Sequence, residues 1–161
     1  MRVVEGESVA INRDYIGFEF SSDEAYEVTR GKIREFADAI GDPNPAYRDQ
    51  AAARALGHPD VIAPPTFGIV ATGAASEKNP ILRPDFGLNY RMVVHGEQKF
   101  SYRRPIRAGD VLSTKGRIVE IRDAGRNELV RIETDIVDVH GDVVGTAVNT
   151  IISRGTAEGG Q

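Results

Sequence analysis

Two side chains in one short loop have the types and the spacing for proton transfer. Asp42 and Tyr47 lie five residues apart in the stretch Gly-Asp-Pro-Asn-Pro-Ala-Tyr, and both carry groups that can act as general acids or bases. The two prolines between them hold the loop extended. Asp42 and Tyr47 are therefore the candidate catalytic pair. Asp and Asn are also common in such turns for local hydrogen bonding alone, so a purely structural role for the loop is the alternative.

The Tyr at position 47 limits what this pair can do. A Tyr side chain has a reference pKa of about 10, against about 6.5 for His, so ionising it at pH 7 costs about 4 kcal/mol. As a general base near neutrality Tyr47 would be weak, although it can still donate a hydrogen bond to water or to a hydroxyl. If Asp42 is the single effective acid or base, we expect slow catalysis.

Helices are expected on both sides of this loop. Thr29 is a suitable N-cap for a helix that Gly41 ends, and the apolar residues between them recur at i, i+3, i+4 and i+7. Asp49 can cap a short helix over residues 50–56. A third helix, rich in Gly and Ala, is predicted to start at Pro65 and to end near Lys78. Its small residues would let a sheet or a partner backbone approach closely.

The second half of the chain has the pattern of an antiparallel sheet. Candidate strands cover residues 93–103, 111–122, 129–139 and 143–154, separated by turns that contain Gly and Asp. Two or three helices followed by such a meander predict an α+β domain. One sheet wrapped around the third helix would explain the small residues of that helix.

Composition limits the functions that need to be considered. The 161 residues suggest a single domain over 1–161, with an ordered core at about 14–154 and loosely ordered ends at 1–12 and 155–161. The net charge of −4 argues against general nucleic-acid binding. There is no Cys, no apolar run of about 20 residues and no apolar signal core at the N-terminus, so we expect a cytoplasmic protein away from membranes. No metal or cofactor is expected, because metal clusters and nucleotide-binding motifs are both absent from the sequence.

Three segments resemble the MaoC-like and FAS1-like dehydratases, and in particular their N-terminal-domain branch. They are residues 33–45 (IREFADAIGDPNP), residues 62–68 (IAPPTFG) and residues 95–111, which include Arg104-Pro-Ile-Arg-Ala-Gly-Asp. That branch includes the non-catalytic subunits of mycobacterial (3R)-hydroxyacyl-carrier-protein dehydratase. The resemblance covers roughly residues 14–154. It implies a hot-dog fold, in which an antiparallel sheet wraps around a long central helix.

The resemblance also implies a reaction and a set of site residues. Members of the family interconvert (3R)-3-hydroxyacyl and trans-2-enoyl thioesters, using Asp and His at the positions of Asp42 and Tyr47, while the residue matching Asn44 holds the loop or the substrate. Many active relatives have Gly where Pro65 stands, and proline has no N–H for a thioester oxygen. The donor would then shift to Thr66 or Phe67. The implied substrate-binding residues are Pro65, Thr66, Phe67, Gly68, Ile69 and Val70 along the helix, and Arg103 and Arg104 for phosphopantetheine or a carrier protein.

Three functions remain open on the sequence. The first is a substrate-binding subunit in fatty acid metabolism that takes an acyl-CoA or acyl-carrier-protein thioester and pairs with a hot-dog subunit carrying the Asp-x4-His pair. The second is a self-sufficient (R)-specific enoyl-CoA hydratase, a homodimer using Asp42 with Tyr47 or His58. The third is a regulatory acyl-CoA-binding module. The surroundings of His95 and His140 favour structural roles for both. Residues 83–107 carry six basic and two acidic side chains, which indicates either a solvated strand face or a landing patch for a phosphate or an acidic carrier protein.

Overall fold

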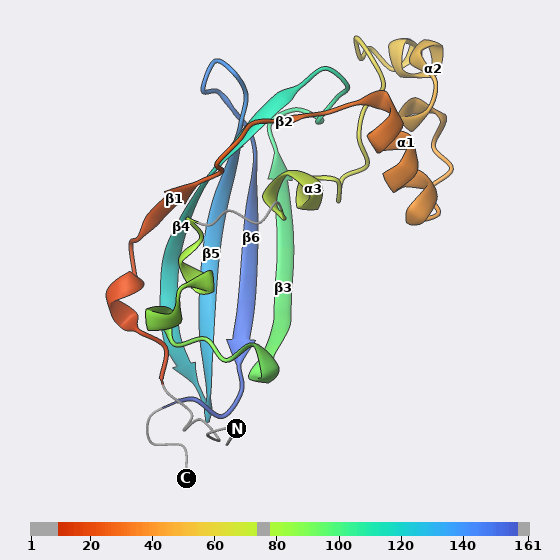
Figure 1. Ribbon diagram of the computed structural model, residues 1–161. Coiled ribbons are helices and arrows are strands. Elements are labelled where there is room, and N and C mark those ends of the chain that lie inside the picture. Colours follow the sequence, from red (N-terminus) through yellow and green to blue (C-terminus); the bar gives the residue numbers. More distant parts are fainter. Residues whose placement is uncertain (1–9, 74–77, 158–161) are drawn as a thin grey trace, which may run out of the picture.

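An antiparallel sheet forms the body of the protein (Figure 1). The structure, a computed structural model, describes residues 10–73 and 78–157. The strands follow the order β1-β4-β5-β6-β3, and β2 makes a further short pairing with β4. Helices and strands together give the α+β class that the sequence predicts. The strands are β1 Glu19–Ser21, β2 Tyr26–Glu27, β3 Val93–Tyr102, β4 Val111–Ala124, β5 Asn127–Val137 and β6 Val143–Ser153.

The four long strands lie where the alternating pattern predicts them, with ends that differ by at most two residues. β1 and β2 were not predicted. They are three and two residues long, too short to show an alternation, and they form because β4 offers a free edge: Glu19 pairs with Arg117, and Tyr26 pairs with Leu112. The N-terminal segment is thereby added to the sheet by tertiary pairing.

Two capped helices lie together beyond one end of the sheet (Figure 1). They are α1, Arg30–Ala39, and α2, Gln50–Ala55. The Thr29 side chain accepts the N–H of Lys32 in α1, and the Asp49 side chain accepts the N–H of Ala52 in α2, as the sequence predicts. In the part of the chain that the structure describes, no helix is long and apolar enough to span a bilayer.

The third helix, α3, is shorter than predicted. It covers Gly68–Thr72, and Pro65 lies in the turn before it. Gly73 is its C-cap, Asn79 caps a separate 3-10 turn, and residues 74–77 of the expected helix lie outside the described residues. Glycine at both ends lowers helix propensity by about 1 kcal/mol per residue, which favours a short element. The long central helix of the prediction is therefore not seen among the described residues, although α3 does lie against one face of the sheet (Figure 1).

Two apolar clusters hold these elements together. One joins α1 and α3 to the sheet through Ile33, Phe67 and Val144. The other packs beside Phe86 at the opposite end of the sheet. Ile11 in this second cluster is 2% exposed and Thr156 is 4% exposed, so ordered packing extends past the predicted limits of 14 and 154.

Candidate functional site

The loop that follows α1 bonds its polar side chains to its own backbone. Asp42 Oδ1 accepts the N–H of Asn44 at 3.0 Å, and Asn44 Oδ1 accepts the N–H of Ala46 at 3.0 Å. The second bond opens the 3-10 turn η2, Pro45–Tyr47. Asp42 also closes α1, because its N–H donates to the carbonyl of Ala37 at 2.9 Å. These bonds shape the loop and direct Tyr47 inward.

Tyr47 is buried, with 6% of its surface exposed, and it lines a cavity of about 260 Å³. The cavity lies between η2, the segment before α3 and the end of β3 with the turn that follows it. Its lining residues are Tyr47, Ile62, Ala63, Pro64, Pro65, Tyr102, Arg103, Arg104, Pro105 and Ile106. Of the predicted site residues, the structure thus places Tyr47, Pro65, Arg103 and Arg104 around one space. Its lining does not include the other predicted site residues, which are Asp42, Asn44, Thr66, Phe67, Gly68, Ile69 and Val70.

Every polar side chain on this cavity is a hydrogen-bond donor, and no carboxyl lines it. The donors are two phenols and two guanidinium groups, while the remaining lining residues are apolar. Among the residues that the structure describes, no hydrogen-bond partner is found for the Tyr47 hydroxyl. Such a cavity suits a ligand with a carbonyl oxygen in its apolar part and a negative charge near the mouth.

Tyr102 is the residue that sequence reasoning missed. Its hydroxyl oxygen accepts the N–H of Gly68, the first residue of α3, at 3.1 Å. Burial raises the pKa of Tyr102, and the bond from Gly68 offsets part of that rise. The phenol therefore keeps its proton near neutral pH. The signal available in the sequence was its place beside Arg103 at the end of a strand, on the same face as Phe100.

Arg103 and Arg104 are neighbours in the chain but differ in their partners. Arg104 Nη1 lies 2.7 Å from Oδ2 of the buried Asp110, and its Nη2 lies 3.7 Å from Asp138 Oδ2. Arg103 is exposed and has no ion pair within the described part of the chain. Elsewhere in the basic segment, Arg83 lies 5.0 Å over the ring of Phe18. Arg103 is therefore the cation at this cavity that is available to an anionic ligand.

The predicted oxyanion donors before α3 are only partly available. The N–H of Phe67 donates to the carbonyl of Pro64 at 2.9 Å, whereas the N–H of Thr66 has no acceptor among the described residues. Phe67 is buried and meets Phe36 edge-on at 5.3 Å between ring centroids. Val70 packs against the same core, and Ile69 lines a separate space of about 110 Å³ between α3 and the sheet.

Comparison with known proteins identifies the family of this chain. Residues 14–147 match the family described as FAS1-like, dehydratase domain region. The chain belongs to this dehydratase family. It is also 47% identical over 152 residues to a UPF0336 protein of Thermobifida fusca, covering 94% of this chain and 99% of that one. A UPF0336 protein of Streptomyces avermitilis is 44% identical over 151 residues, with 94% and 100% of the two chains covered.

Solved structures place the FAS1-like dehydratase chain in a hot-dog-like fold. A MaoC-like dehydratase matches with a TM-score of 0.78 and 30% identity over 87% of this chain; the match spans 42% of that longer protein. The C-terminally truncated HadBC (3R-hydroxyacyl-ACP dehydratase) complex of Mycobacterium tuberculosis matches with a TM-score of 0.76 and 25% identity, covering 86% of this chain and 97% of that chain. The family resemblance read from the motifs is confirmed.

No histidine lines the cavity in this member of the family. His58 follows α2, where its N–H donates to the carbonyl of Ala53 at 3.0 Å, and it is not a lining residue. His95 lies in β3, and His140 lies in the turn between β5 and β6. Among the described residues, no three His, Cys, Asp or Glu side chains gather as they would around a metal ion.

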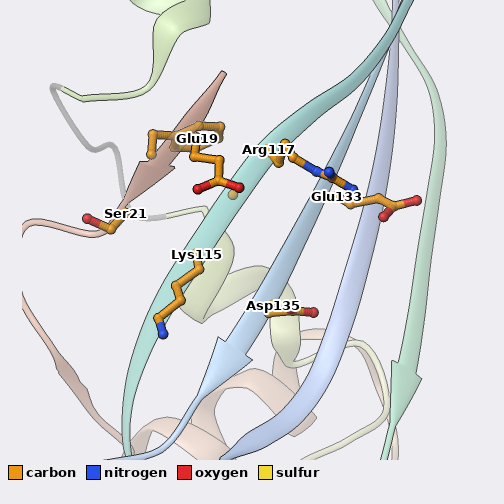
Figure 2. Close-up of a pocket in the computed structure, with 8 residues that line it drawn as sticks. Glu19, Ser21, Lys115, Arg117, Glu133 and Asp135 are labelled. Carbon is orange, nitrogen blue, oxygen red and sulfur yellow. The ribbon is translucent and has the colours of Figure 1, made fainter. Parts of the chain in front are cut away.

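A larger hollow of about 550 Å³ lies over β1, β4 and β5 (Figure 2), and it shares no lining residue with the Tyr47 cavity. Most of its labelled side chains are charged, and their signs alternate across the strands. Glu19 is in register with Arg117, which is in register with Glu133, while Lys115 is in register with Asp135. Opposite charges on neighbouring strands stabilise a solvated sheet face and leave little net field for a ligand. Size alone therefore does not make this hollow the functional site.

Proposed function

We propose that this protein binds an acyl thioester in the Tyr47 cavity and serves as the substrate-binding subunit of a hydroxyacyl-thioester dehydratase. The observation that carries the proposal is Tyr47 itself, a buried phenol that lines a donor-rich cavity. The family resemblance implies a catalytic His at this position in active members. Asp42, the other half of the pair, is bonded to the loop backbone and does not line the cavity. A partner subunit would then supply Asp and His.

The proposed ligand pose follows from the chemistry of the lining residues. The thioester lies near Tyr47, and the acyl chain runs along the apolar lining residues Ile62, Pro64 and Ile106. The helix residues expected from the sequence are not used in this pose, because Phe67 is fully buried and Ile69 lines a separate space. The phosphate of phosphopantetheine, carried by CoA or by a carrier protein, lies at Arg103, whose guanidinium is available. Arg104 already has carboxylate partners and is assigned a structural role.

The free edge of β3 supports the proposed pairing with a second subunit. Within the described residues β3 pairs only with β6, so a ten-residue edge can accept another strand. Val94 in this strand and Met92 just before it are exposed apolar side chains. The HadBC dehydratase of Mycobacterium tuberculosis is a complex, which fits an assembly of two different subunits. We propose that the β3 edge meets either a second copy or a partner with the Asp-x4-His pair.

Turnover of crotonyl-CoA tests the proposal. The purified protein alone should bind the thioester and hydrate it very slowly, and addition of a partner bearing the Asp-x4-His pair should produce fast hydration. Tyr47→His is the matching gain-of-function variant, because it restores the imidazole in the same loop. Fast turnover by the protein alone, abolished by Asp42→Ala, would show that it is a self-sufficient hydratase instead. Tight binding with no dehydratase co-purifying from the native host would favour a regulatory acyl-CoA-binding module.

A further inference from the structure

Tyr102 is held in place from three sides. Its hydroxyl oxygen accepts the N–H of Gly68, 34 residues away in the chain. Its ring lies over Gly145 on the neighbouring strand β6, and it stacks on Phe100 with an angle of 16° and 6.1 Å between centroids. These contacts come from α3, β6 and β3, so the phenol has little freedom to rotate away.

Two glycines make the room that this position needs. A Cβ at Gly68 would lie 2.6 Å from the Tyr102 hydroxyl oxygen, and one at Gly145 would lie 2.7 Å from Cδ1 of the same ring. A comparable contact elsewhere in the sheet, Phe20 over Gly116, uses an aromatic ring without a hydroxyl. Packing over a sheet glycine thus requires only the ring, and the hydroxyl of Tyr102 needs a separate explanation.

The hydroxyl has one hydrogen to donate after its oxygen has accepted the Gly68 N–H. Within residues 10–73 and 78–157 no acceptor for that hydrogen is found. Tyr102 lines the cavity together with Tyr47 and Arg103, and no carboxyl there competes for the donor. Because burial raises the pKa of Tyr102, the phenol stays protonated in the physiological range.

We propose that the Tyr102 hydroxyl donates a hydrogen bond to the thioester carbonyl oxygen of the bound ligand. The Gly68 N–H polarises this hydroxyl from behind, so the pair acts as a relay from amide to phenol to carbonyl. The relay provides a carbonyl donor from β3 in a chain where Pro65 has no N–H to offer. This inference rests on the proposed acyl-thioester binding and names the group that positions the carbonyl.

Isotope-edited infrared spectroscopy tests the assignment on the full chain. Butyryl-CoA labelled with 13C at the thioester carbonyl is a suitable probe, because it has no double bond to hydrate. A hydrogen bond lowers the carbonyl stretching frequency, so binding to the wild-type protein should shift the band downward. Tyr102→Phe keeps the ring over Gly145 and removes only the hydroxyl; it should abolish most of the shift and weaken binding about fivefold.

The matched control is Tyr90→Phe. Tyr90 is an exposed phenol whose hydroxyl donates to the carbonyl of Ile81 at 2.8 Å, and it is not a lining residue. This variant should retain both the band position and the affinity. Gly68→Ala is a second route to the same result if Tyr102→Phe folds poorly, because the added Cβ would displace the hydroxyl, and the shift should again be lost.

The possible outcomes separate this inference from the proposed function. Butyryl-CoA that binds with the same shifted band to Tyr102→Phe and wild type would overturn the role of Tyr102 and leave acyl-thioester binding intact. A shift lost only in Tyr47→Phe would assign the donor to Tyr47 and equally overturn the inference. Absence of butyryl-CoA binding to the wild-type protein would overturn the proposed function, and this inference with it.

Discussion

Two regions meet at the Tyr47 cavity and use their polar side chains in opposite ways: a helical wall, residues 30–65, and a strand wall, residues 100–110 together with β6. In the helical wall, behind the residues that line the cavity, Asp42 and Asn44 each bond a backbone N–H two residues ahead. On the strand wall, Tyr102 bonds Gly68 across 34 residues, and Arg104 reaches Asp110 and Asp138. The motif that identifies the family thus defines the shape of a loop. The groups able to hold a ligand come mainly from the end of β3, where long-range contacts orient them.

The largest expected effect is a loss of stability from overpacking the strand wall. Gly145→Ala should lower the free energy of unfolding by about 2 kcal/mol, because overpacking of this kind costs about 1–3 kcal/mol. The new Cβ would lie 2.9 Å from the Ser101 carbonyl oxygen, and a backbone atom cannot move aside cheaply. Urea unfolding measures the change. Gly31→Ala in α1 is the control. The new Cβ would lie 4.0 Å from its nearest neighbour, Thr29 Oγ1, and alanine has the higher helix propensity, so this variant should be slightly more stable.

The next prediction contrasts the two neighbouring arginines. Arg104→Ala should destabilise the protein by about 2 kcal/mol, because it removes a close partner of the buried Asp110 carboxyl. The backbone N–H of Arg107 still donates to that carboxyl at 2.9 Å, which limits the loss. Arg103→Ala should leave stability within about 0.5 kcal/mol and instead weaken butyryl-CoA binding. Equal melting temperatures for the two variants would contradict this division of roles.

A smaller and pH-dependent effect is expected on the helical wall. Hydrogen bonding from Arg30, aided by the Val61 N–H and the Gln50 amide, holds the pKa of Asp60 well below its usual range despite partial burial. Because the pKa is lower in the folded state, the stabilisation is fully present above the unfolded value of about 3.9 and is lost as pH falls below it.

Asp60→Asn isolates this contribution. At neutral pH the variant should be less stable by about 1 kcal/mol, a figure kept low because Arg30 is largely exposed and its attraction is screened. Its difference from wild type should shrink as the pH is lowered from about 5 to about 2. Urea unfolding across this range measures the difference. A gap that grows on acidification would show that the pKa shift has the opposite sign.

The smallest expected effect tests whether Asp42 stabilises its loop by accepting a backbone hydrogen bond. Asp42→Asn keeps an oxygen for the Asn44 N–H and should leave stability nearly unchanged, whereas Asp42→Ala should cost about 0.5–1 kcal/mol. Thermal unfolding of the two variants provides the comparison. A large loss of stability in Asp42→Asn would indicate that the charge of Asp42 is needed. Asp42 would then resemble the charged groups of the strand wall more than a local cap of its own loop.

Local signals in the sequence predicted much of this fold, and four of the predicted site residues line one cavity in the structure. α1 and α2 begin where Thr29 and Asp49 cap them, and the long strands follow their alternating patterns. The motif loop follows α1 as predicted, whereas the catalytic roles of Asp42 and Tyr47 stay predictions. One failure occurred where a distant contact decides the outcome, because β1 and β2 exist through pairing with β4. The predicted length of α3 was wrong for a local reason, because Gly68 and Gly73 lower the helix propensity at its two ends.

Sequence alone determined the family, the α+β class and the presence of Tyr47 five residues after Asp42 in the motif, because these depend on residue type and short-range spacing. Tertiary structure decided which side chains share the cavity. Arg103 and Arg104 look equivalent in the chain, yet only Arg104 meets Asp110 and Asp138. Tyr102 is positioned by Gly68 and Gly145, which lie in other elements. Such positions depend on the packing of segments far apart in the sequence, and that packing cannot be predicted from residue spacing along the chain.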